Sequence, residues 1–137
     1  MKNAIQNVAD FHIACDQPVR ATPQLIPAGE IALRKSLINE EVNNELFPAM
    51  DSGDLVEIAD ALADTIYVVI GTAHHYGIPL GAVWDEVQRS NMTKPDPVTG
   101  KVKKREDGKI LKGPGFSPAD IGKVLMAHGW GTNSGNQ

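Results

Sequence analysis

Residues 54–76 read DLVEIADALADTIYVVIGTAHHY, and this stretch decides the fold class. Acidic and apolar residues alternate in its first half, while its second half, from Ile66 to Ala73, is apolar nearly all round. A helix that is apolar on every side is typical of one buried in a bundle or an oligomer interface. Asp51-Ser52-Gly53 precedes the stretch and offers capping side chains, and Gly77 follows it as a helix-ending glycine. The stretch therefore predicts a long, buried helix.

Apolar residues at helical spacing predict further helices before and after this stretch. Prolines at 18, 23 and 27 predict an extended connection, and residues 91–118, rich in proline, glycine and lysine, predict a loop in which Asp107-Gly108 closes a small hairpin. The predicted fold class is all-α, an antiparallel bundle of about four to five helices. Besides 54–76, the expected helices run from about Ala4 to Ala14, from about Ala28 to Met50, from near Pro79 to about Arg89, and from Ser117, as N-cap, to about His128.

The length of 137 residues predicts one domain, which we expect to span residues 1–128, followed by a disordered tail at 129–137. One copy has few helices and leaves the apolar helix exposed, so we expect a homodimer or homotetramer to complete the bundle. Cys15 is the single cysteine, which rules out an intrachain disulfide. The apolar runs are too short to span a membrane, and the N-terminus lacks the blocks of a signal peptide. We therefore expect a soluble, cytoplasmic protein without a membrane partner.

Ten carboxylates and no lysine or arginine lie between Ser36 and Gln88. Residues three, four or seven apart share a helix face, so two such helices packed antiparallel aim carboxylates at each other. Acidic helix faces are usually solvated surface, but the apolar run after Asp64 favours burial of the second helix. Facing carboxylates repel unless cations neutralise them, which predicts a cage for a hard divalent ion such as Mg²⁺. The carboxylates at this spacing are Glu40, Glu41 and Glu45 on one helix and Glu57, Asp60 and Asp64 on the next.

Basic residues are concentrated in the loop that follows. Seven of the 13 lie between Lys94 and Lys112. The segment from Lys101 to Arg105 has no aromatic residues interleaved for stacking, so we expect a solvated face or lid there and no nucleic-acid partner.

Four motifs follow one another in order over residues 31–121. They are LRKSLINEE at 33–41, LADTIYV at 62–68 followed by Gly71, RSNMTK at 89–94, and DGK at 107–109 with KGPGFSPADI at 112–121. In these motifs the chain resembles the all-α nucleoside triphosphate pyrophosphohydrolases, a superfamily that includes MazG, phosphoribosyl-ATP pyrophosphohydrolase and dimeric dUTPases. It is most similar to small, stand-alone, phage-type members, which implies the host cytoplasm if the chain is phage-encoded.

The resemblance implies a metal site made by Glu-x-x-Glu on one helix and Glu-x-x-Asp on the next. Carried over by position, these patterns fall on Glu41 and Asn44, and on Ala61 and Asp64, so two expected carboxylates are absent. Candidate replacements lie close by, Glu40 and Glu45 on the first helix and Glu57 and Asp60 on the second. Asp60, which shares a face with Asp64, is the favoured one. The implied cofactor is Mg²⁺ or Mn²⁺, with two or more ions in the site. The implied ligands are Glu41, Asn44, Glu57, Asp60 and Asp64, with Glu40 as the catalytic group that orients or deprotonates the attacking water.

The implied reaction is metal-dependent hydrolysis of a (deoxy)nucleoside triphosphate between its α and β phosphates, giving the monophosphate and pyrophosphate. The phage-type likeness favours a purine substrate, dGTP or GTP. Two other substrates stay open, dUTP and phosphoribosyl-ATP, and so does a non-catalytic, metal-stabilised nucleotide-binding module. The implied substrate-binding residues are Asn91, Lys94, Lys109 and Lys112, since lysine binds phosphate well as a point charge.

Overall fold

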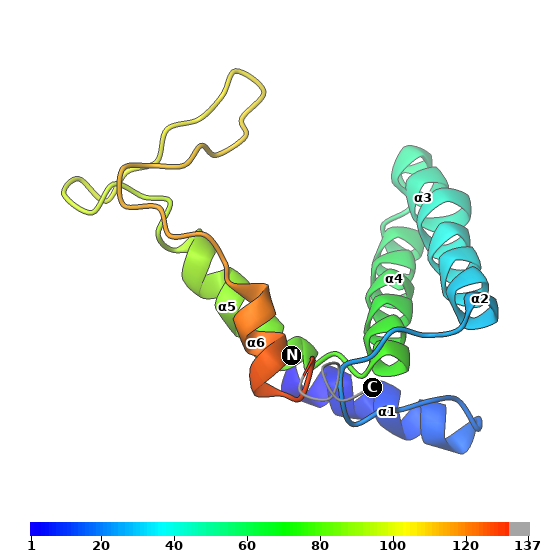
Figure 1. Cartoon of the computed structure of the whole chain (residues 1–137). Helices are drawn as coiled ribbons and strands as arrows, with labels where there is room; N and C mark the ends of the chain where they lie inside the picture. Colours follow the sequence, from blue (N-terminus) through cyan, green and yellow to red (C-terminus); the bar gives the residue numbers. More distant parts are fainter. Residues whose placement is uncertain (132–137) are drawn as a thin grey trace. The chain divides into compact units, whose positions relative to one another are not determined.

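The regular structure of the chain is almost entirely helical (Figure 1). The computed structural model describes residues 1–131, and within them the β structure is limited to an isolated antiparallel bridge between Lys104 and Ile110. The predicted all-α fold class is confirmed, while residues 132–137 of the predicted tail lie outside the described residues. The helices are α1 (Lys2–Ala14), α2 (Ala28–Asn39), the π-helix η1 (Glu40–Leu46), α3 (Phe47–Ser52), α4 (Leu55–Tyr76), α5 (Leu80–Asn91) and α6 (Ile121–Ala127).

Contacts along the chain define two compact units, the first spanning Met1–Leu80 and the second beginning at Gly81. The first unit holds α1, α2, η1, α3 and α4, and the second holds α6 and all but the first residue of α5. The single domain predicted for residues 1–128 stays a prediction.

Helix α4 is the central helix of the first unit and confirms the helix predicted at 54–76. The expectation that Asp51-Ser52-Gly53 caps its N-terminus is wrong. The cap is Asp54, whose carboxylate accepts hydrogen bonds from the backbone N–H groups of Val56 (3.0 Å) and Glu57 (3.3 Å). Gly77 ends it in the left-handed conformation, with φ at +64°. Figure 1 shows α2 and α3 running beside α4 in the opposite direction, with α1 near its C-terminal end.

The predicted helix from Ala28 to Met50 is interrupted, because η1 replaces its middle with a π-helix. The wider turn is visible at its end, where the N–H of Phe47 bonds to the carbonyl of Val42, five residues earlier. Pro48 supplies a physical reason. Proline has no N–H for the carbonyl of Asn44, and in a regular α-helix its ring clashes with that carbonyl. The widened turn changes which side chains of η1 share a face, so the α-helical spacing of Glu40, Glu41 and Glu45 does not carry over.

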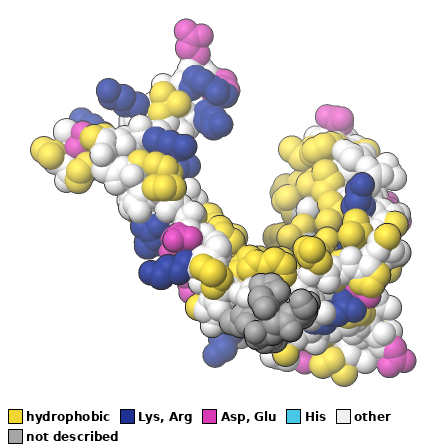
Figure 2. Space-filling model, viewed as in Figure 1, with side chains coloured by type: hydrophobic (Ala, Val, Ile, Leu, Met, Phe, Trp, Pro, Cys, Tyr) yellow, Lys and Arg dark blue, Asp and Glu magenta, His cyan; other side chains and the backbone are white. Residues whose placement is uncertain are grey.

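The apolar core between these helices is small. It joins Leu46, Ala49 and Ala61, with Ile58 packed against them. Many larger apolar side chains of the first unit are exposed in the single chain, and Figure 2 shows hydrophobic side chains gathered over α3 and α4. The exposed ones include Phe47, Met50, Leu62, Ile66 and Val69. Such a surface is typical of a protein that associates, but the oligomer stays a prediction.

The proline-rich connection between α1 and α2 covers the C-terminal end of α4. The last carbonyls of a helix lack partners within it, and here the connection supplies them. The N–H of Arg20 bonds to the carbonyl of His74 (3.0 Å), and the N–H of Gln24 bonds to that of Tyr76 (2.9 Å). The Arg20 guanidinium donates to the carbonyl of His75 (2.6 Å). The connection is therefore fixed by main-chain hydrogen bonds as well as by its prolines.

A buried polar cluster joins α1, α2 and α4. Arg34 and His12, 5% and 4% exposed, both approach Gly71, where an added Cβ would lie 2.7 Å from Arg34 Nη2 and from His12 Nε2. Arg34 donates to the carbonyl of Val68 (2.8 Å) and to the hydroxyl of Thr72 (3.1 Å). Backbone and hydroxyl oxygens thus satisfy a buried cation here.

Next to it, His75 is 1% exposed and shares a hydrogen bond with Glu30 through Nδ1 (3.0 Å). Two hydrogen bonds from Arg20, and then the one with His75, lower the pKa of Glu30 to about 2. His75 Nε2 is buried without a hydrogen-bond partner among the described residues.

Acidification is expected to destabilise the first unit through His12. Burial first, and then the neighbouring Arg34, His75 and His74, lower its pKa from the ordinary 6.5, against the opposing effect of its hydrogen bond with the Pro18 carbonyl. A lowered pKa means that the contribution of His12 to stability is complete above about pH 6.5 and is lost as pH falls toward the folded-state pKa. One titrating group changes the free energy of unfolding by at most about 1.4 kcal/mol per pH unit. Urea unfolding between about pH 8 and pH 5 measures this slope.

His12→Gln removes the ionisable ring, keeps a donor for the Pro18 carbonyl and should show a shallower slope. The matched control is His128→Gln at the exposed end of α6, which should keep the wild-type slope. Equal slopes in wild type and His12→Gln would contradict the assignment.

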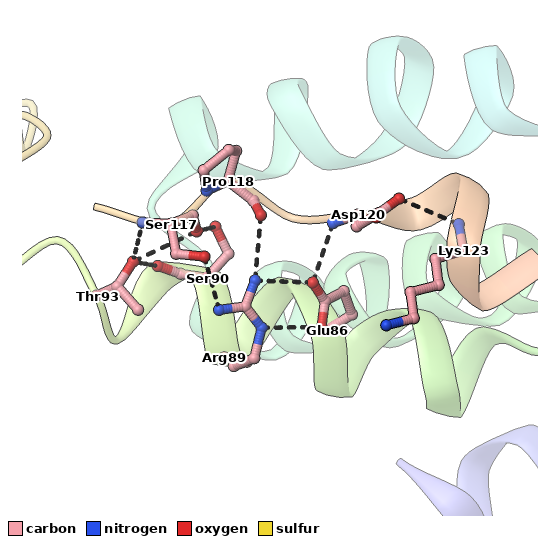
Figure 3. Close-up of polar contacts among 8 residues, drawn as sticks. All are labelled: Glu86, Arg89, Ser90, Thr93, Ser117, Pro118, Asp120 and Lys123. Atoms are coloured by element: carbon pink, nitrogen blue, oxygen red, sulfur yellow. Dashed lines mark hydrogen bonds and ion pairs between the residues drawn. The ribbon is translucent and has the colours of Figure 1, made fainter. Parts of the chain in front are cut away.

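In the second unit, α5 is joined to the segment that leads into α6 (Figure 3). Arg89 donates to the hydroxyl of Ser117 (3.0 Å) and to the carbonyl of Pro118 (3.1 Å), and Ser90 donates to the carbonyl of Ser117 (2.8 Å). Because these groups bond to α5, the prediction that Ser117 caps the last helix is wrong. Asp120 is the cap, and its carboxylate accepts from the N–H of Lys123 (3.1 Å).

Two smaller predictions concern the same part of the chain. The fourth predicted helix is confirmed as α5. The Asp107-Gly108 hairpin forms with the single bridge of Lys104 and Ile110, and the N–H of Arg105 bonds to the carbonyl of Lys109 (2.7 Å). Over residues 1–131, no helix combines the length and hydropathy that crossing a membrane requires.

Candidate functional site

A cavity of about 410 Å³ in the first unit is lined mainly by oxygen-bearing side chains. Within the described part of the chain, every charged side chain in its lining is a carboxylate. Like charges that line one cavity repel each other, and a bound cation would relieve this repulsion. The lining consists of Asn44, Glu45, Pro48, Ala49, Ser52, Glu57, Asp60, Ala61 and Asp64.

Three of the carboxylates reach the cavity from α4 because of their spacing. Glu57, Asp60 and Asp64 lie three and four residues apart, which places them on one side of an α-helix. Ala61, between them, is 5% exposed and belongs to the apolar core, so the same face packs against the opposing helix. On the other wall, η1 contributes Asn44 and Glu45, and the short α3 contributes Ser52.

The structure brings together four of the five predicted metal ligands, namely Asn44, Glu57, Asp60 and Asp64. Glu41, the fifth, is half-buried and outside the lining. Burial first, and then the carboxylate of Asp64 followed by those of Glu40, Glu45 and Asp60, raise the pKa of Glu41 above its ordinary value. Glu41 therefore shares the electrostatic field of these acids without lining the cavity. Glu40, predicted as the catalytic group, is exposed at the first position of η1, and its role stays a prediction.

Two lining residues with side-chain oxygens are absent from the predicted ligand set. Glu45 is predicted only as a candidate replacement for a missing carboxylate, and it belongs to the acidic segment that has no lysine or arginine. Ser52 has a weaker one, as part of the turn before α4, where its hydroxyl donates to the carbonyl of Ala49 (2.6 Å) and accepts from the N–H of Asp54 (3.1 Å).

The chemistry of the lining fits a hard divalent ion, although the side chains are not gathered into a closed ligand cluster. Across residues 1–131, no three acidic, histidine or cysteine side chains are arranged to hold a metal ion by themselves. Mg²⁺ suits such a setting, because it commonly uses one or two protein carboxylates and completes its shell with water and substrate phosphates. The oxygen donors of the cavity meet this requirement.

Glu41→Gln is expected to stabilise the metal-free protein near neutral pH. A carboxyl group whose pKa is raised in the folded state destabilises the fold when it is ionised. Its contribution to the free energy of unfolding is therefore least favourable at high pH and becomes more favourable as pH falls. Removing this charge should raise the free energy of unfolding by about 0.5–1 kcal/mol, a value typical of partly solvated charges. The measurement is urea unfolding at pH 7 with a chelator present. Glu106→Gln, on the exposed hairpin, is the control, and an equal gain there would show a general charge effect.

In the second unit, a separate pocket of about 660 Å³ contains four lysines. It includes Lys94 and Lys112, two of the predicted substrate-binding residues, together with Lys101 and Lys103. The other two predicted residues are outside its lining. Lys109 lies in the hairpin, where its N–H donates to the carboxylate of Asp107 (3.1 Å), and Asn91 ends α5.

Comparison with known protein families identifies a family that the chain matches. The model of a family described as phosphoribosyl-ATP pyrophosphohydrolase matches residues 8–91, which is more than half of the chain. The matched stretch includes every residue that lines the carboxylate cavity, and the pocket of four lysines lies after it. No curated protein matches the chain.

Proposed function

Because the chain belongs to the phosphoribosyl-ATP pyrophosphohydrolase family, we propose that it hydrolyses a (deoxy)nucleoside triphosphate to the monophosphate and pyrophosphate. The observation that carries this proposal is the carboxylate cavity, which lies wholly within the residues matched to the family. A purine substrate, dGTP or GTP, is our first choice. Phosphoribosyl-ATP, which the family description names, and dUTP are the alternatives.

In this proposal Asp60 and Asp64 are the principal metal ligands, since they lie one turn apart on α4 and both line the cavity. Asn44 and Glu57 add oxygen donors from the two walls, and Glu41 adds negative charge beside them. When bound, Mg²⁺ or Mn²⁺ supplies Lewis-acid stabilisation of charge on phosphoryl oxygens.

The remaining parts of the reaction are assigned to residues outside the cavity. The Glu40 carboxylate orients the attacking water and accepts its proton, which is the role of a general base. Lys94, Lys109 and Lys112 hold the phosphate chain by charge-assisted hydrogen bonds, and Asn91 orients sugar or phosphate.

The deciding experiment is pyrophosphate release from a panel of ribo- and deoxynucleoside triphosphates and phosphoribosyl-ATP, with Mg²⁺ or Mn²⁺. We expect turnover of one or a few of these nucleotides, which would name the base and sugar. If a folded preparation releases pyrophosphate from none of them, the catalytic proposal fails.

A second candidate is a non-catalytic, metal-stabilised nucleotide-binding module. Asn44 and Ala61 favour it, because they occupy positions where the resembling enzymes carry carboxylates. This candidate expects nucleotide and metal binding without pyrophosphate release, and a fall in melting temperature when a chelator removes the ion.

We also propose that the chain works as a homodimer or homotetramer, because one copy leaves large apolar side chains of α4 exposed. Light scattering during gel filtration measures the mass directly. A monomer at assay concentrations would contradict this proposal.

A further inference from the structure

The lysine pocket of the second unit is a candidate binding site that the carboxylate chemistry does not use. Its four lysines come from two separate segments of the loop, with Lys94, Lys101 and Lys103 on one and Lys112 on the other. The only acid in its lining is Asp96, whose Oδ1 already accepts from the N–H groups of Val98 (2.8 Å) and Thr99 (3.3 Å). The pocket therefore has a clear excess of positive charge.

Main-chain contacts order the first segment and join it to the second. The N–H of Asp96 bonds to the carbonyl of Lys101 (2.8 Å), and the N–H of Leu111 bonds to that of Lys103 (2.8 Å). Gly113 fits closely against Lys94, where an added Cβ would lie 2.5 Å from the carbonyl oxygen. The lysine stems thus start from fixed backbone positions.

The side chains in the loop differ in what they contact. The ammonium group of Lys112 lies 4.9 Å from the ring centroid of Phe116, a cation–π contact that directs it. Arg105, by contrast, is paired with Asp107 in the hairpin and is outside the pocket lining. The pocket lining thus includes some of the basic residues of this loop and excludes Arg105, which is already paired with an acid.

Four lysines line one pocket, and a multivalent anion bound there would relieve the repulsion between their charges. Lysine donors suit phosphate oxygens, and a pocket of this volume accommodates a ligand of nucleotide size. No aromatic side chain is part of the described lining, so the pocket has phosphate-binding groups but no ring on which a base would stack.

We propose that this pocket binds a polyphosphate anion through Lys94, Lys101, Lys103 and Lys112, without requiring a metal ion. The anion is either the phosphate chain of the nucleotide or the pyrophosphate product, and this identification rests on the proposed function. Lys101 and Lys103 thereby become phosphate-binding residues alongside Lys94 and Lys112.

The test is isothermal titration calorimetry of the full chain with sodium pyrophosphate in a chelator. We expect binding that weakens as salt is raised. The variant Lys101→Gln/Lys103→Gln should weaken it by about tenfold or more, because it removes two positive charges that donate charge-assisted hydrogen bonds to the anion. The matched control, Lys2→Gln/Lys104→Gln, removes the same charge outside the pocket lining and should change affinity by less than about twofold.

No pyrophosphate binding by the wild type in chelator, or equal weakening in both double variants, would overturn the proposal. To identify the anion, dGTP affinity is measured in the Asp64→Asn background with and without Lys101→Gln/Lys103→Gln. If the lysine substitutions weaken dGTP binding, the pocket binds the phosphate chain of the substrate. If they weaken only pyrophosphate binding, the pocket binds the product.

The outcome is separable from that of the proposed function. If pyrophosphate binds through these lysines but no nucleotide is hydrolysed, the pocket stands and the proposed reaction fails. If a nucleotide is hydrolysed while Lys101→Gln/Lys103→Gln leaves pyrophosphate affinity unchanged, the pocket fails and the reaction stands.

Discussion

Asp64→Asn is expected to reduce nucleotide hydrolysis by about 10²–10³-fold, because loss of several kcal/mol of charge stabilisation at the metal corresponds to that factor. Asp64 lines the cavity, lies one turn after Asp60 on the same helix and is the first carboxylate to raise the pKa of Glu41. Asparagine has nearly the same shape, and Asp64 is exposed, so the fold should be retained. Steady-state pyrophosphate release with saturating Mg²⁺ measures the loss, and circular dichroism checks the fold.

The matched control is Asp10→Asn, the same chemical change on the exposed face of α1, where the carboxylate contacts Gln6. It should keep wild-type turnover within about twofold, as expected of an isolated surface charge. Wild-type turnover in Asp64→Asn would contradict the metal role. A preparation that loses activity and helix content together would leave Asp60→Asn as the second variant to measure, and full activity there would contradict the cavity as the active site.

Gly77→Ala is expected to destabilise the first unit by more than about 3 kcal/mol, which is beyond the usual range for a single substitution. Gly77 has φ at +64°, a conformation that costs an L-residue about 1–2 kcal/mol. In addition, the new Cβ would lie 2.1 Å from the carbonyl oxygen of Thr22. That oxygen belongs to the connection that bonds to the end of α4, so relieving the clash would strain the hydrogen bonds of Arg20 and Gln24. Urea unfolding measures the change.

Gly53→Ala separates the conformational cost of positive φ from the cost of the steric clash. Gly53 has φ at +74°, and an added Cβ there meets nothing within 4 Å. It should therefore show only the conformational cost of about 1–2 kcal/mol. Similar losses at Gly53 and Gly77 would mean that the connection moves away freely, and they would contradict the close contact with Thr22.

Local signals in the sequence predicted the helices well where no distant partner intervenes. Gly77 ends α4 as its residue type predicts, and the spacing of Asp60 and Asp64 places them in one cavity. Ser117 shows the opposite case. It has the residue type of a cap, but Arg89 and Ser90 bond to it from a helix more than twenty residues away in sequence. Such a long-range contact has no local signal.

The candidate site, too, has parts that local sequence signals predict and parts that they do not. α-Helical spacing groups Glu41 with Glu45, whereas the π-helix places Asn44 and Glu45 at the cavity and Glu41 beside it. Pro48 is visible in the sequence, but a proline inside a helix can kink it or end it as well as widen a turn. The residue type alone therefore does not predict the π-helix. The meeting of Lys112 with Lys94 depends on the path of a long loop, which composition does not determine.

The π-helix also has a consequence for how this protein can vary. An α-helix turns by about 100° per residue, so one residue inserted or deleted between rigid helices would normally rotate everything beyond it by that angle. A π-turn absorbs such a residue locally. Changes in length within Glu40–Leu46 can therefore reorient Asn44 and Glu45 while the buried Arg34 of α2 stays in place. An insertion or deletion in this short segment can therefore move the oxygen donors on one wall of the cavity without disturbing the packing of α2 against α4.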